Sequence, residues 1–216
     1  PLCSLAAGRI DGDNRADLVV ALSRTPFVAG RLLLYGGAAG TPTTLGGGTQ
    51  PADLALADMD NDGDLDLVLA EIGATAGIYL YDNQAGTLAS PRGPIAYGVT
   101  NPLEVSFTVA EINGDSHLDL ALGITPMVAL PLPPSEVRLM LGQAGLNLAA
   151  PTRVHQSQGF LRLAAGDLEG NGRSDLAVLD MAAMRVTVLQ DHGTGGFTGT
   201  TPLSCTARPR ALTMLD

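Results

Sequence analysis

The chain has 216 residues, 45% of them hydrophobic, with 4% aromatic residues, no Trp and a formal net charge of −10. All twelve basic residues are Arg, and this acidic balance disfavours nucleic acid as a partner. No run of about 18 apolar residues occurs, so no membrane span is expected. The 27 Gly and 14 Pro indicate many turns between short elements.

Four units of similar organisation follow one another along the chain. Each begins with a short strand of small and apolar residues, continues with an acidic loop and a second strand, and ends with a third and a weaker fourth strand. The first strands are expected at 4–7, 54–57, 107–110 and 163–166. The second strands are expected at 18–20, 67–69, 118–122 and 176–179, and the third at 31–35, 77–81, 136–141 and 185–189. No segment shows a convincing helical period, so we expect no helix.

The acidic loop is the clearest repeat. Its ninth position is always Asp, and successive copies of this Asp are 49, 53 and 56 residues apart. The four loops read RIDGDNRAD at 9–17, DMDNDGDLD at 58–66, EINGDSHLD at 111–119 and DLEGNGRSD at 167–175. A period of this length, with four strands per unit, is typical of the blades of a propeller.

The sequence therefore predicts an all-β protein, a β-propeller built of four-stranded blades. Uninterrupted apolar runs in the first two strands of each unit indicate burial on both faces, as in stacked blades, whereas a two-sheet sandwich would alternate. Four repeats and the first strand of a fifth are predicted, with blade 1 at 1–50, blade 2 at 51–103, blade 3 at 104–159, blade 4 at 160–208 and the further strand at 209–216.

The loop at 58–66 has the composition of a calcium site. Carboxylates alternate along it around Gly63, where the backbone must turn sharply, and so many adjacent anions would repel one another without a cation. An EF-hand is excluded, because the loop has no Glu at its twelfth position and no flanking helices. The predicted ligands are the side chains of Asp58, Asp60, Asp62 and Asp66 at positions 1, 3, 5 and 9, with the backbone carbonyl of Asp64 at position 7.

The third and fourth loops are each predicted to hold one Ca²⁺ in the same way, and the second, with the most anionic side chains, should bind most tightly. Their ligands would be Glu111, Asn113, Asp115, Asp119 and the carbonyl of His117 in the third loop, and Asp167, Glu169, Asn171, Asp175 and the carbonyl of Arg173 in the fourth.

The first loop departs from this pattern, because Arg9 stands where the first carboxylate belongs. A guanidinium competes with a metal ion for Asp11, Asp13 and Asp17. We expect either a loop held by Arg9 or a weakly occupied site, with Arg9 turned outward as the alternative.

The loops and their flanks resemble the FG-GAP/VCBS repeats of integrin-α-like β-propellers. In that family a strand ending V-x-L-L-G-x-G-x-G-x-F precedes a first strand and a D-x-[ND]-x-D-G-x-x-D loop, and residues 137–145 and 186–197 match the former pattern. The resemblance covers essentially the whole chain and implies a propeller with calcium-binding loops. The sequence also departs from this pattern. Arg9 replaces the first acidic ligand, Asn14 and Ser116 replace the loop Gly, and Asn171 replaces the fifth-position Asp.

No enzyme activity is expected, since the chain has no GxSxG, HExxH or phosphate-binding loop. The expected function is that of a secreted, calcium-stabilised β-propeller serving as an extracellular adhesion, scaffold or filament-type self-assembly module, because millimolar extracellular calcium fills even weak sites. Two alternatives remain open. One is a carbohydrate-binding lectin, disfavoured by the absence of Trp and the presence of only four Tyr, and the other is a non-catalytic domain of a larger extracellular enzyme.

The ends of the chain suggest its partners. Residues 211–215 resemble the first strand of a further unit, whose unpaired edge would need strands from outside the chain, from further blades or from a second copy. Cys3 and Cys205 could form a disulfide between neighbouring copies in an oxidising compartment, or a bridge within one chain. Protein partners or copies of the chain are therefore expected, and glycans remain possible partners.

Overall fold

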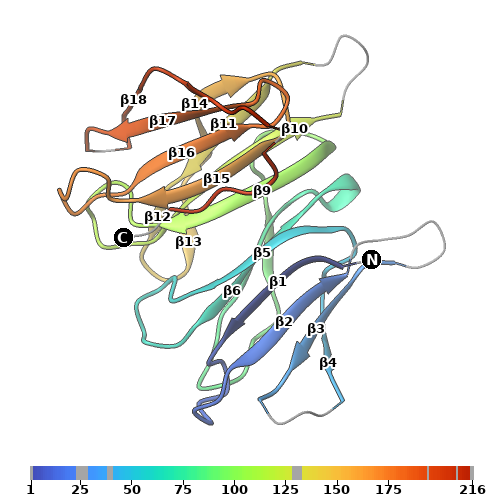
Figure 1. Cartoon of the computed structure of the whole chain (residues 1–216). Helices are drawn as coiled ribbons and strands as arrows, with labels where there is room; N and C mark the ends of the chain where they lie inside the picture. Colours follow the sequence, from blue (N-terminus) through green and yellow to red (C-terminus); the bar gives the residue numbers. More distant parts are fainter. Residues whose placement is uncertain are drawn as a thin grey trace. The chain divides into compact units, whose positions relative to one another are not determined.

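The computed structural model describes residues 2–22, 29–37, 41–127, 133–193, 195–207 and 209–214, and they form an all-β structure (Figure 1). The chain divides into two compact units, Pro1–Ala96 and Tyr97–Asp216. Within the described ranges the only helical element is a 3₁₀ turn, η1, at Gly73–Thr75. This part of the chain contains no helix that could cross a membrane.

The first unit consists of two four-stranded antiparallel sheets, each formed by strands in chain order. The first contains β1 (Leu2–Gly8), β2 (Asp17–Leu22), β3 (Arg31–Tyr35) and β4 (Thr43–Leu45). The second contains β5 (Pro51–Ala57), β6 (Asp66–Glu71), β7 (Gly77–Tyr81) and β8 (Arg92–Ile95). A shared core that includes Val19, Leu32, Leu54, Leu69 and Tyr79 joins the two sheets.

The second unit repeats this arrangement. One sheet has the order β14-β11-β10-β9 and the other the order β15-β16-β17-β18, and a core that includes Ala121, Val137, Leu163 and Val178 joins them. The strands are β9 (Pro102–Ala110), β10 (Asp119–Pro126), β11 (Ser135–Met140), β14 (Thr152–Ser157), β15 (Leu161–Gly166), β16 (Asp175–Asp180), β17 (Arg185–Asp191) and β18 (Phe197–Gly199). Three shorter strands are β12 (Gly142–Gln143) and β13 (Asn147–Leu148), which pair with each other, and β19 (Leu203–Ser204), which pairs with β17.

The repeated unit of four antiparallel strands is confirmed, but the predicted burial on both faces is found only in part. Every residue of the second strands β6, β10 and β16 is buried, as expected, but in β2 buried and half-buried residues alternate. In β1, by contrast, Leu5 is 53% exposed and Ala7 is also exposed. The reason lies in the packing of the sheets, because the core shared with the second sheet covers the face of β1 and β2 that carries Ala6 and Val19 and leaves the face that carries Leu5 open.

The predicted further strand at the C-terminal end is not formed within the described residues, since 209–214 carry no strand pairing. Strand assignment requires a hydrogen-bonded neighbour, and the expected neighbour lies outside this chain, so the strand stays a prediction. Leu215 and Asp216 lie outside the described residues.

In the fourth sheet, a buried acidic side chain at the end of β16, opposite the acidic loop, holds the turn that follows. Asp180 is 2% exposed and accepts hydrogen bonds from the backbone N–H groups of Ala182 (3.0 Å) and Ala183 (2.7 Å), and from the hydroxyl of Ser157. Burial alone would raise the pKa of Asp180, but the hydrogen bonds from Ala183 and Ser157 outweigh it and lower the pKa. The carboxylate therefore stabilises the turn between β16 and β17.

Replacing Asp180 with Ala should lower the free energy of unfolding by about 3 kcal/mol, because buried N–H donors lose their acceptor. Since the folded-state pKa is depressed, this stabilisation is present above the ordinary Asp pKa and is lost as the pH falls through the folded-state value. Urea unfolding at neutral pH and at low pH measures both effects. An equal loss of stability at both pH values would contradict the role given to the carboxylate.

Candidate metal centre

The acidic loops connect the first and second strands of the four sheets, and all four share a pattern of left-handed backbone residues. Positions 4 and 6 of each loop have positive φ, between 63° and 97°. Gly adopts this left-handed conformation readily and Asn tolerates it, so two such residues curl the backbone tightly. The eight residues are Gly12 and Asn14, Asn61 and Gly63, Gly114 and Ser116, and Gly170 and Gly172. The requirement at position 4 was not recognised in the sequence, although only Gly or Asn occurs there.

Ser116 is the least suited of these residues to its conformation, with φ of 70°. A left-handed conformation costs an L-residue other than Gly about 1 kcal/mol. Replacing Ser116 with Gly should therefore raise the free energy of unfolding by roughly 0.5–1 kcal/mol, after the greater chain entropy of Gly in the unfolded state is allowed for. Thermal unfolding measures the change, and His117→Gly, at the next position, is the control that should destabilise. A lower melting temperature for Ser116→Gly would be inconsistent with strain at position 6.

The ninth-position aspartates hold the loops to the sheets. All four are at most 1% exposed. In each, Oδ2 accepts a hydrogen bond of 2.7–3.0 Å from the backbone N–H at position 2 of the loop, from Ile10, Met59, Ile112 and Leu168 in turn. Oδ1 accepts one of 2.7–2.9 Å from a residue at the end of the third strand, from Gly37, Asn83, Gly142 and Asp191 in turn. These predicted ligands, Asp17, Asp66, Asp119 and Asp175, therefore have a structural role that sequence reasoning missed.

The first-position side chain closes the loop by accepting backbone hydrogen bonds. Asp58 accepts from Asp62 (3.1 Å) and Gly63 (2.9 Å), and Glu111 accepts from Gly114 and Asp115. Asp167 accepts from four consecutive loop residues, of which Gly172 is the nearest at 2.6 Å. Of these bonds, the one from Gly172 does most to lower the pKa of Asp167.

Arg9 cannot accept these bonds, and the structure leaves it exposed. No ion pair joins it to Asp11, Asp13 or Asp17 among the described residues, so the expected loop held by Arg9 is not found and Arg9 is turned outward. The loop is instead held by its own carboxylates, since Asp11 accepts from the N–H of Asp13 (3.0 Å) and Asp13 accepts from that of Arg15 (2.8 Å).

The second loop brings three carboxylates together. One oxygen from each of Asp58, Asp60 and Asp66 lies within 4.8 Å of the other two. Oδ1 of Asp60 is buried and has no hydrogen-bond partner in the described structure. Burial, and then the charge of Asp62, raises the pKa of Asp60, and burial raises the pKa of Asp66 to about 6. A buried, unpaired oxygen among like charges is unfavourable without a cation, so these residues fit a divalent metal ion.

The other predicted ligands of the second loop, Asp62 and Asp64, are less buried than Asp66. Asp62 is exposed, and its Oδ1 accepts the N–H of Asp64 at 2.9 Å. Hard cations such as Ca²⁺ take six to eight oxygen ligands, so the cluster needs further donors. The free lone pairs of Asp62 and the carbonyl of Asp64 stay the predicted ones.

In the third and fourth loops the predicted ligand side chains form hydrogen bonds with other residues of the same loop. Hydrogen bonds from the Asn113 amide and the His117 N–H lower the pKa of Asp115. In the fourth loop, Nε of Arg173 lies 2.8 Å from the buried Oδ2 of Asp191. This ion pair involves only the side chain of Arg173, so the role of its backbone carbonyl as a ligand stays a prediction. Metal binding by these two loops therefore stays a prediction.

Asn83 joins two neighbouring loops in the first unit, a role that no sequence signal indicated. It is fully buried, and its Nδ2 donates to the carbonyl of Ile10 in the first loop (3.0 Å) and to that of Leu65 in the second (3.1 Å). The second loop is thus fixed both to its own sheet and to the loop of the preceding repeat.

The fold and the loops together define an all-β repeat protein in which an acidic loop joins the first two strands of each antiparallel sheet. Residues 9–69, which include the first two loops, match the family model described as FG-GAP-like repeat. The chain therefore carries an FG-GAP-like repeat, and the resemblance seen in the sequence is confirmed for that segment. A comparison with curated proteins finds no match.

Proposed function

We propose that this chain is a calcium-stabilised β-propeller that acts outside the cell as a non-enzymatic adhesion, scaffold or self-assembly module. The observation that carries the calcium part is the cluster of Asp58, Asp60 and Asp66, in which a buried carboxylate oxygen of Asp60 lacks a partner. Calcium would supply that partner and neutralise the charge, and so would hold the loop between β5 and β6 against its sheet.

The propeller arrangement is supported by the regularity of the repeats. Each unit of the structure contains two sheets whose first four strands pair in chain order, each with the acidic loop at the same place. The match of residues 9–69 to an FG-GAP-like repeat agrees with this arrangement. Stacked blades would bury the apolar faces that such sheets present on both sides.

A binding or scaffold role fits the chemistry of the site better than catalysis. The carboxylates of the loops are engaged by backbone N–H groups, which leaves them suited to holding structure rather than to moving protons. A lectin function gains no support from Tyr79, Tyr81 and Tyr97, which are at most 9% exposed, and the half-buried Tyr35 is left as the one tyrosine that a sugar could reach. Protein partners, or copies of the chain itself, are the partners we propose.

Counting bound calcium tests the proposal directly. Protein freed of metal with a chelator and then dialysed against Ca²⁺ should bind about three ions per chain, one in each loop with an acidic first residue. Binding of no ion would overturn the calcium part. Size-exclusion chromatography with and without reductant tests self-assembly, since Cys205 is a free, half-buried thiol. The side chain of Cys3 lies outside the described residues, so the proposed disulfide partner stays a prediction.

A further inference from the structure

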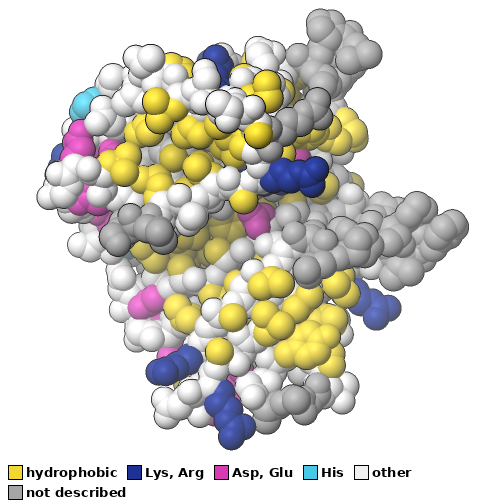
Figure 2. Space-filling model, in the orientation of Figure 1, with side chains coloured by type: hydrophobic (Ala, Val, Ile, Leu, Met, Phe, Trp, Pro, Cys, Tyr) yellow, Lys and Arg dark blue, Asp and Glu magenta, His cyan; other side chains and the backbone are white. Residues whose placement is uncertain are grey.

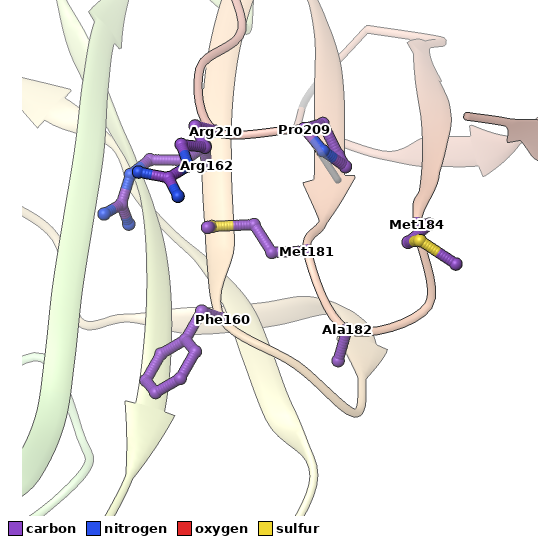
Figure 3. Close-up of a pocket in the computed structure, with 7 residues that line it drawn as sticks. All are labelled: Phe160, Arg162, Met181, Ala182, Met184, Pro209 and Arg210. Carbon is purple, nitrogen blue, oxygen red and sulfur yellow. The ribbon is translucent and has the colours of Figure 1, made fainter. Parts of the chain in front are cut away.

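A pocket of about 750 Å³ lies at the end of the fourth sheet opposite its acidic loop (Figure 3). It is lined by Phe160 and Arg162 at the start of β15, by Met181 and Met184 in the turn between β16 and β17, and by Pro209 and Arg210 in the C-terminal segment. Its volume is within the range of small-molecule binding sites, which is roughly 300–1,000 Å³. None of the structural or metal-binding roles described above uses this pocket.

The pocket presents large apolar side chains to solvent. Phe160 is 40% exposed and Met184 is 41% exposed. In the view of Figure 3, Met181 extends into the space between Phe160 and the two arginines. Figure 2 shows hydrophobic side chains gathered over the fourth sheet. Methionine adapts its shape to different apolar ligands, and covering such side chains is favourable by about 25 cal/mol per Å².

The charge of the pocket is positive. Arg162 forms an ion pair with Glu104, and its Nη1 also donates to the carbonyl of Leu161 at 2.9 Å, so its charge is partly satisfied. Arg210 is exposed and has no ion pair within the described residues. The described lining contains no acidic side chain. Two guanidinium groups beside an apolar surface favour an anion, because each can donate paired hydrogen bonds to a carboxylate.

We propose that this pocket binds a small amphipathic carboxylate, with its apolar part against Phe160, Met181 and Met184 and its carboxylate at Arg210. A cationic ligand would meet only like charge, and a neutral one would leave Arg210 without a partner. Because Pro209 and Arg210 belong to the C-terminal segment, the ligand would also hold that segment against the fourth sheet. This inference is independent of calcium binding, and it assigns a ligand to the segment that the propeller arrangement predicts to be a further strand.

Three ligands with the same apolar chain and different head groups test the proposal. Octanoate, octanol and octylammonium are titrated into the full chain and followed by NMR or calorimetry. Octanoate should bind saturably to one site, at least tenfold more tightly than octylammonium. The reason is that one charge-assisted hydrogen bond lowers the dissociation constant by about a factor of ten. Equal binding of the three, or binding of none, would overturn the proposal.

Arg210→Gln is the deciding variant, because it removes the charge and keeps a polar side chain of similar length. It should weaken octanoate binding about tenfold and leave octanol binding unchanged. Arg92→Gln is the matched control, since Arg92 is also exposed but lies in β8 of the other unit, where it pairs with Asp82. Unchanged octanoate affinity in Arg210→Gln, or an equal loss in Arg92→Gln, would show that Arg210 does not recognise the anion.

Discussion

Asp60→Asn should raise the melting temperature of the calcium-free chain and also remove much of the increase that calcium produces. In the calcium-free state Asp60 buries an unpaired oxygen beside Asp58 and Asp66, so removing its charge relieves repulsion by about 1 kcal/mol. With calcium, the same change removes an anionic ligand. At a concentration 100 times the dissociation constant, an ion adds about 2.7 kcal/mol, which corresponds to several degrees for a chain of this size.

Asp64→Asn is the matched control, because position 7 of the loop is expected to contribute its backbone carbonyl and not its side chain. Its calcium-dependent increase should be close to that of the parent protein. Scanning calorimetry of the parent and both variants, with excess chelator and with excess calcium, gives the six values needed. If Asp60→Asn lowers the melting temperature in chelator and retains the calcium effect, the cluster is not a metal site.

Much of the fold could be predicted because its signals are local. The third strands β3 and β7 have the predicted bounds of 31–35 and 77–81. The second strands β2, β6 and β16 extend one or two residues beyond the predicted bounds at each end. Apolar runs set the strands, and the fixed order of strand, loop and strand within each repeat sets their pairing. The acidic loops were identified for the same reason, since their spacing is visible without any tertiary information.

What could not be predicted depends on contacts between segments distant in the sequence. The residue near the end of the third strand that donates to the ninth-position Asp is Gly, Asn, Gly or Asp in the four repeats, so this shared hydrogen bond leaves no pattern. The exposure of Leu5 depends on which face of β1 packs against the second sheet. The outward direction of Arg9 depends on a balance between solvation and ion pairing that composition does not reveal.

The ninth-position aspartates allow their structural role to be separated from a role as metal ligands. Asp119 is fully buried, and it accepts hydrogen bonds from the N–H groups of Ile112 (2.9 Å) and Gly142 (2.7 Å). Asp119→Ala leaves both buried donors unpaired, which should cost about 4 kcal/mol in the free energy of unfolding. Because these bonds involve no metal, the loss should be present in excess chelator.

Asp115→Ala provides the contrast within the same loop. Asp115 is exposed and accepts from the amide of Asn113 (2.9 Å) and the N–H of His117 (2.8 Å), both of which can turn to water, so its loss in chelator should be at most about 1 kcal/mol. In calcium, however, Asp115→Ala should lose the stabilisation that the ion provides to the third loop. Urea unfolding of both variants, with chelator and with calcium, separates the two roles. If Asp119→Ala is destabilised only when calcium is present, the buried carboxylate serves the metal alone. A large loss in both conditions means instead that it holds the loop to β10 and β12 before any ion binds.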